Sequence, residues 1–208
     1  MTKHWSTDRT EAFSDGVFAI AITLLVLDLH VPDDELTNLW AGIAAQWPSY
    51  LAFVTSFATI AGIWLVHHRL FAHMDFINST VIRINLLLLL DVTFLPFPTR
   101  LMAQALNNED AERAAVLFYG ATLLASSLAL AAVWRAVAGD HSLVASGGQD
   151  EGGELKVIGR AIVPGIGLYV LATGVALVDP AVGVWAYFFI ALLLIVRVHN
   201  ADGPAASS

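Results

Sequence analysis

The amino-acid sequence predicts an all-α polytopic membrane protein, and three observations lead to this fold class. Of the 208 residues, 57% are hydrophobic and 13% are charged, whereas about a quarter are charged in an ordinary soluble domain. The mean hydropathy is +0.70. Apolar segments of roughly 20 residues recur along the chain, and an α-helix of that length crosses the hydrocarbon layer of a bilayer. A soluble domain of this size could not bury so much apolar surface.

Six segments qualify, or nearly qualify, as membrane spans. Their approximate ranges are 11–29, 48–66, 83–102, 114–134, 161–178 and 180–196. The fourth range is the clearest, because it runs for 21 residues without a charge, and the last two are separated by a tight turn at Asp179 and Pro180. We expect the six spans to form one transmembrane domain that covers residues 1–208.

The first span contains a short apolar run, residues 16–27, between Asp15 and Asp28. A secretory signal peptide can contain such a run. However, acidic residues precede the run and no small-residue cleavage site follows it. We therefore expect a retained helix with acidic residues at both ends.

The second span lies within a stretch, residues 36–66, that carries no charge and is too long for one upright helix. Pro48 divides this stretch, because a residue without an N–H is tolerated at a helix start. The part before Pro48 has apolar residues at helical spacing and is predicted to form a short amphipathic helix at the membrane interface. These residues are Leu36, Trp40, Ile43 and Trp47.

The third span contains polar residues and prolines within an apolar stretch: Asn85, Asp91, Pro96 and Pro98. A carboxylate near mid-span costs about 2.5–3.5 kcal/mol on insertion, so Asp91 should face protein or water. We expect it to form a hydrogen bond with an Asn or Ser group on an adjacent helix, and a place in a proton or ion path is the alternative. The two prolines should bend or end the helix.

The charged residues predict the orientation of the chain. With six spans, eight basic residues fall on one side and two on the other, which places both termini in the cytoplasm and the chain in the plasma membrane. The outer side also carries eight acidic residues, which would concentrate cations near it. These are Asp28, Asp33, Asp34, Glu35, Glu109, Asp110, Glu112 and Asp179. The net charge of −8 and the lack of a basic footprint argue against a nucleic-acid partner.

The first span carries an apolar stripe above a polar cluster. Ile20, Leu24 and Leu27 are spaced at i, i+4 and i+7, which places them on one face of a helix, with Thr23 on its flank. On a lone helix such a stripe usually indicates packing. The polar residues directly below the stripe, Arg9, Ser14 and Asp15, favour a functional interpretation.

Arg9, Phe13, Ser14 and Asp15 form the pattern R-x-x-x-F-S-D. This pattern matches the signature of the transmembrane protein 175 family of cation channels, which the chain resembles. Further matches lie at the end of the second span and in the third span: Trp64, His67, His68, Phe71, Asn85, Pro96 and Phe97. The resemblance covers roughly the first half of the chain in detail and the remainder by the number of spans.

The resemblance implies a potassium-permeable channel, in which four six-helix subunits surround a central pore lined by the first helix. Ile20 matches the hydrophobic constriction, and Leu24 and Leu27 match further apolar rings. Thr23 matches a hydroxyl layer associated with modest cation selectivity. The chain has no Thr-Val-Gly-Tyr-Gly-like segment that could form a carbonyl filter, so weak discrimination between potassium and sodium is expected. Potassium is the expected occupant of the pore, and no cofactor is expected.

The resemblance also implies that Arg9 and Asp15 tie the first helix to its neighbours. We expect Asp15 to pair with Arg9 or with a histidine of the second span, in a cluster that Trp64 and one of the two histidines orient. A pH sensor is an alternative role for His67 and His68, because histidine titrates near neutrality. A metal site at this pair is disfavoured, because adjacent side chains on a helix point in different directions.

A proton-coupled secondary transporter is the main alternative to a passive channel, with Asp91 and a histidine as the relay. Such a transporter would saturate and would require a counter-ion. Enzymatic activity is not expected, because the sequence contains no Gly-x-Ser-x-Gly elbow, no cysteine and no His-Glu-x-x-His run.

Overall fold

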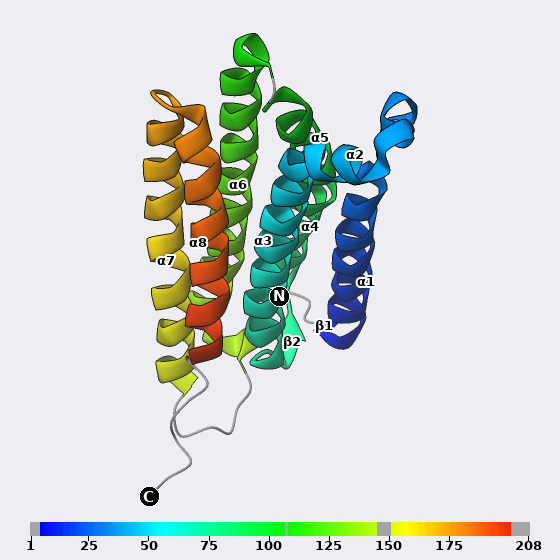
Figure 1. The fold of residues 1–208 in the computed structure, drawn as a ribbon. Helices are drawn as coiled ribbons and strands as arrows, with labels where there is room; N and C mark the ends of the chain where they lie inside the picture. The colour runs from blue at the N-terminus through cyan, green and yellow to red at the C-terminus, as the bar shows by residue number, and fades with distance from the viewer. Residues whose placement is uncertain (1–4, 107, 145–150, 201–208) are drawn as a thin grey trace, which may run out of the picture.

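The computed structural model describes residues 5–106, 108–144 and 151–200, and this part of the chain is mostly helical. It contains six helical stretches that are long and apolar enough to cross a membrane. They are Asp8–Asp28, Trp47–Ala72, Ser79–Ala105, Asp110–Ala138, Leu155–Ala176 and Pro180–Arg197. The prediction of a polytopic all-α protein with six spans is therefore confirmed. The strand β1 (Trp5–Ser6) and the last turn of α8 (Pro180–Asn200) lie at the same end of the bundle, as an even number of spans requires (Figure 1).

The first span consists of the α-helix α1 (Asp8–Leu24) and a 3-10 segment, η1 (Leu25–Asp28). The sequence predicted one helix over residues 11–29. The helix starts earlier, and its C-terminal end is wound more tightly, with 3.0 rather than 3.6 residues per turn. A period difference of this size cannot be recognised in a four-residue stretch of sequence.

A small two-stranded sheet holds the start of α1 in place. β1 pairs antiparallel with β2 (Phe76–Ile77), in the connection that follows α3 (Trp47–Ala72). Next to this sheet, the Thr7 hydroxyl donates a hydrogen bond to the carbonyl of Met74 at 3.1 Å. The N-terminal end of α1 is therefore fastened to the loop between the second and third spans.

Two short helical segments, η2 (Asp33–Asn38) and α2 (Leu39–Ala45), precede α3. Figure 1 shows α2 running across the end of the bundle rather than along it. Trp40 on α2 is 83% exposed, as expected for a helix that lies at a membrane interface. Pro48 lies in the first turn of α3, where its missing N–H leaves no helical hydrogen bond unmade. The predicted division of this stretch near Pro48 is therefore present.

The third span is divided at its prolines into α4 (Ser79–Phe94) and α5 (Pro96–Ala105). Leu95 lies between the two helices, and Pro96 has no N–H with which to continue the hydrogen-bond ladder of α4. The predicted bend or end at the prolines is therefore confirmed. At the other end, the Asn78 side chain accepts hydrogen bonds from the backbone N–H groups of Thr80 and Val81, both at 3.0 Å, and caps α4.

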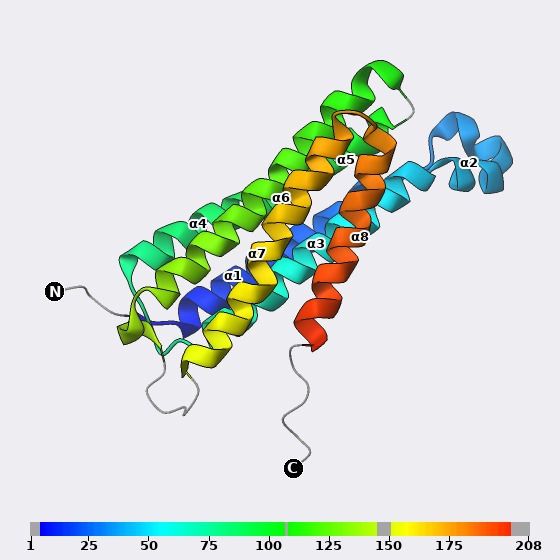
Figure 2. The same cartoon turned by 90° about the vertical axis from the view of Figure 1, so that its left-hand side faces the viewer.

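The remaining spans are α6 (Glu109–Ala138), α7 (Glu151–Ala176) and α8. α6 packs against α4, α5, α7 and α8, so it lies at the centre of the bundle (Figure 2). Gly120 of α6 allows close packing, because a Cβ atom there would lie 2.0 Å from the Tyr187 hydroxyl of α8. The neighbouring Tyr119 is fully buried. The extent of the chain as one domain over all 208 residues remains a prediction.

Candidate functional site

The two faces of α1 have different surroundings. Ser14, Phe18, Ala21 and Leu25 recur at spacings of three and four residues and are buried against the bundle. The opposite face carries the predicted stripe, and its side chains are largely uncovered: Phe13 is 56% exposed, Ile20 59%, Leu24 41% and Leu27 72%. The stripe is thus separate from the packing face of α1, and it is not part of the core of this chain.

α1 lies at the edge of the bundle, where it packs against α3 and α4 (Figure 1). In the most apolar part of the first span, 22% of the residues are buried inside the chain, compared with 50% for α6. Apolar side chains on such an edge must meet lipid, another protein surface or an ion path. The chain alone leaves this face open.

The 3-10 winding of η1 changes the alignment of the stripe. Side chains three residues apart eclipse one another in a 3-10 helix, so the tighter winding brings Leu27 closer to alignment with Leu24 at the C-terminal end of the span. Thr23 beside them is exposed, and its hydroxyl donates a hydrogen bond to the carbonyl of Ile20 at 2.9 Å. A hydroxyl that donates to the backbone keeps its oxygen lone pairs available. Thr23 can therefore offer an oxygen ligand to a cation.

A buried hydrogen-bond chain links α1 to α4 and α3. The Ser14 hydroxyl donates to the carbonyl of Thr10 at 2.8 Å and accepts from the Asn85 side-chain amide at 3.0 Å. The Asn85 carbonyl oxygen lies 2.9 Å from Nε2 of His67, whose ring stacks on Phe71 with the ring centroids 4.2 Å apart. Because the amide oxygen can only accept, Nε2 of His67 is the donor. Three spans are thus connected through fully buried polar groups.

Beside this chain of hydrogen bonds, a second cluster joins the N-terminal half of α1 to α3. The Trp64 indole N–H donates to the Asp15 carboxylate at 2.9 Å. The ring of His68 stacks on Trp64, and its Nδ1 lies 3.2 Å from a Glu11 carboxylate oxygen. Among the described residues no ion pair joins Asp15 to Arg9 within the chain. Asp15 lies instead against Trp64 and His68 of the second span, which is the other arrangement expected from the sequence.

The other two acidic residues singled out from the sequence also have partners. Asp91 accepts a hydrogen bond from Ser126 of α6, which confirms the expected link to a Ser on an adjacent helix. Asp28 is the last residue of η1, with one carboxylate oxygen 3.7 Å from Nε of Arg100 on α5. This ion pair ties the C-terminal end of the stripe to the third span.

Sequence reasoning missed three of the residues that complete these contacts: Glu11, Arg100 and Ser126. The i, i+4 spacing of Glu11 and Asp15 was the available signal for the first, because it places two carboxylates on one face of α1. Nothing local distinguishes the other two, because each meets its partner only after the spans have packed.

Comparisons with known proteins agree with this geometry. The family model described as "Endosomal/lysosomal potassium channel TMEM175" matches residues 9–96, which include the polar clusters and the stripe. A protein of Chamaesiphon minutus that is named a potassium channel is 39% identical over 194 residues, covering 92% of this chain and 94% of that protein. The chain belongs to the TMEM175 family.

Two further comparisons support this membership of the TMEM175 family. A potassium channel of Streptomyces collinus is 44% identical over 127 residues, which cover 61% of this chain and 62% of that protein, less than two thirds of its length. The crystal structure of a TMEM175 homologue from Chamaesiphon minutus, described as a lysosomal potassium-selective channel homologue, superposes with a TM-score of 0.82 at 37% identity. It covers 93% of this chain and 98% of the other. The fold described above is therefore the TMEM175 fold.

Proposed function

We propose that the protein is a potassium-permeable channel that conducts ions passively through a central pore lined by α1. The observation that carries the proposal is the uncovered apolar stripe of Ile20, Leu24 and Leu27 on the helix at the edge of the bundle. The names of its relatives in Chamaesiphon minutus and Streptomyces collinus, both potassium channels, support potassium as the permeant ion. Passive conduction requires no catalytic residue, and we propose no enzymatic activity.

One chain cannot enclose an ion path with a single helix face, so the proposed pore requires several copies. We propose a homotetramer, in which four α1 helices surround a central axis. The position of α1 at the edge of the bundle, with its opposite face packed on α3 and α4, is compatible with that arrangement.

In the tetramer, four Ile20 side chains would form a narrow apolar neck, followed by rings of Leu24 and Leu27. An apolar constriction gates by dewetting, because water and hydrated ions leave a narrow hydrocarbon-lined space. The Thr23 oxygens beside the neck would replace part of an ion's water shell. Four flexible hydroxyls discriminate weakly by size, so modest selectivity for potassium over sodium follows.

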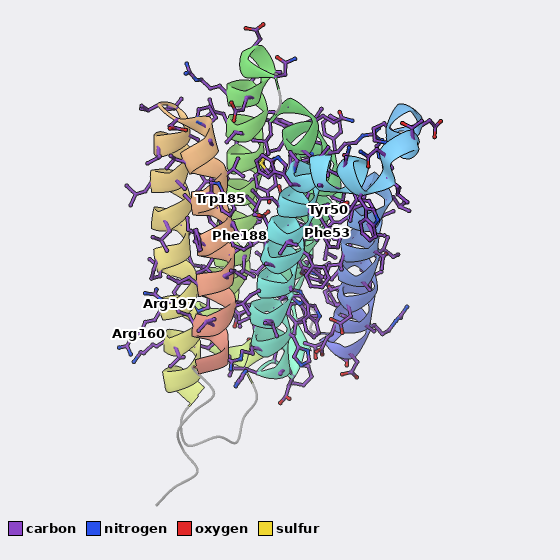
Figure 3. The ribbon with its side chains drawn as sticks, in the orientation of Figure 1. Tyr50, Phe53, Arg160, Trp185, Phe188 and Arg197 are labelled. Atoms are coloured by element: carbon purple, nitrogen blue, oxygen red, sulfur yellow. The ribbon has the colours of Figure 1, made fainter. Side chains whose placement is uncertain are left out.

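We propose that the protein lies in the plasma membrane with both termini in the cytoplasm. The positive-inside rule supports this orientation, because basic residues are concentrated at one end of the spans. Figure 3 shows Arg160 of α7 and Arg197 of α8 toward the end of the bundle where β1 lies, whereas Tyr50 of α3 lies toward the other end. In that orientation Asp28 and seven other acidic residues, eight of the 18 in the sequence, would lie on the outer side.

The contacts of Asp91 favour a channel over a proton-coupled transporter. Asp91 accepts a hydrogen bond from Ser126, and His67 is bonded to Asn85, so neither group is bonded to the other. A relay through this carboxylate and this histidine would need a further carrier between them. Conduction along α1 needs neither group to change its protonation.

Ile20→Asn tests the pore assignment in proteoliposomes. The amide wets the proposed neck, so potassium flux should rise severalfold. Leu171→Asn is the matched control, because Leu171 is 67% exposed on α7, across the bundle from α1, and its substitution should leave flux unchanged. Unchanged flux in Ile20→Asn, or an equal rise in both variants, would exclude the proposed constriction.

A further inference from the structure

Glu11, Asp15 and His68 form a cluster that ion conduction along the stripe does not use. Glu11 and Asp15 lie one turn apart on α1, and His68 faces them from α3. One ligand atom from each residue, a carboxylate oxygen or an imidazole nitrogen, lies within 4.8 Å of the other two. We propose that this cluster is a binding site for a divalent transition-metal cation, with zinc the best match.

The donor set matches the ligand preferences of zinc. One imidazole nitrogen and two carboxylate oxygens are ligands that zinc takes at about 2.0–2.2 Å, with water completing a tetrahedron. Ligand atoms around such an ion lie about 3.3–3.6 Å apart. Nδ1 of His68 and the Glu11 oxygen already lie 3.2 Å apart. No pair in the cluster is more than 4.8 Å apart, so none must close by more than about 1.2 Å.

Trp64 contacts two of the three ligands, Asp15 and His68, and orients them. Its indole N–H donates to one Asp15 oxygen at 2.9 Å, which leaves the other oxygen for the ion. Its ring stacks on His68 with an interplanar angle of 21° and a centroid separation of 5.6 Å, which fixes the plane of the imidazole. Partners of this kind hold ligands in position before the metal arrives and raise its affinity.

The charges and the exposure of the cluster also suit a cation. Two carboxylates at i, i+4 on one helix repel each other, and a divalent cation between them removes that repulsion. The His68 side chain is 50% exposed and that of Glu11 24%, so an ion can reach the cluster from water. His67 next to His68 is not part of the site, because it is buried and bonded to Asn85. The ligands therefore come from two helices, and not from the adjacent histidine pair considered from the sequence.

Zinc binding to the purified full-length protein in detergent tests the site. Isothermal titration with zinc chloride should give one ion per chain, and cobalt chloride should produce the visible absorption bands of a bound Co²⁺ ion. Glu11→Gln and His68→Ala should each abolish this binding. His30→Ala, a substitution of an exposed histidine at the other end of the chain's first span, should bind like the unmodified protein. Absence of zinc binding, or wild-type stoichiometry in Glu11→Gln and His68→Ala, would overturn the proposal.

Anomalous diffraction at the zinc edge keeps the test independent of the folding of the variants. Crystals of the unmodified protein soaked in zinc chloride should show an anomalous peak between α1 and α3 at these three residues. A crystal with no peak there would overturn the site, whatever the variants do.

An ion bound at the cluster would clamp α1 to α3 and so hinder movement of the pore-lining helix. The resulting effect on conduction rests on the proposed channel function. Zinc should therefore reduce potassium flux in proteoliposomes of the unmodified protein and have no effect on His68→Ala. Zinc binding at the cluster without any change in flux would contradict the clamp. Absence of flux in the unmodified protein without zinc would contradict the channel function and not the metal site, because binding is measured without flux.

Discussion

α1 and α6 are both apolar membrane spans, but they differ in what surrounds them. α6 lies at the centre of the bundle with 50% of its span buried, whereas α1 lies at the edge with 22% buried. α6 is held by side-chain packing, as at Tyr119 and Leu123, which are fully buried. α1 relies on one packed face and on polar contacts through Ser14 and Asp15. A span that is weakly buried but specifically attached can present its other face to an ion path.

The largest effect is expected from a cavity in α6. Leu123→Ala should lower the free energy of unfolding by about 2–5 kcal/mol, because the side chain is fully buried and leaves a void. Leu24→Ala removes the same atoms from the exposed stripe and should change stability little while altering potassium flux. Unfolding in mixed detergent micelles measures both variants. Equal destabilisation would show that α1 is as much a core helix as α6.

A smaller effect is expected where α1 is attached. Asn85→Ala leaves the Ser14 and His67 groups without their buried partner, which costs about 1–3 kcal/mol. Hydrogen–deuterium exchange should increase in the inner half of α1 and remain unchanged in α6. Leu87→Ala on the exposed face of the same helix is the control and should change neither. Exchange that increases equally along the whole chain would argue against a local attachment.

The smallest effect is expected at the outer end of α1. Arg100→Gln removes the ion pair with Asp28, whose nitrogen and oxygen are 3.7 Å apart and whose arginine side chain is 57% exposed. Such a pair contributes less than about 1 kcal/mol, and salt should screen it further. Unfolding at low and at high salt measures the difference. A loss as large as that of Asn85→Ala would mean that the outer end, and not the inner cluster, anchors the helix.

The sequence was sufficient for features that depend on local pattern. The six spans followed from the length of their apolar segments, the break between α4 and α5 from Pro96, and the common face of Ile20, Leu24 and Leu27 from their spacing. Each of these depends on residues that are close together in the chain.

The side-chain partners could not be predicted in the same way. Asp15 meets Trp64 from 49 positions away, and Ser14 meets Asn85 from 71 positions away. Such contacts depend on the rotation and the relative height of packed helices, which apolar periodicity leaves undetermined. The Glu11–His68 contact likewise depends on how α1 and α3 pack against each other.

Single-channel recording in a planar bilayer tests passive conduction through the α1 pore most directly. The purified protein, under a potassium chloride gradient, should produce discrete current steps whose reversal potential follows the potassium gradient. Ile20→Asn should raise the open probability or the step size. A saturable uptake that requires a counter-ion gradient, with no current steps in either protein, would contradict the account.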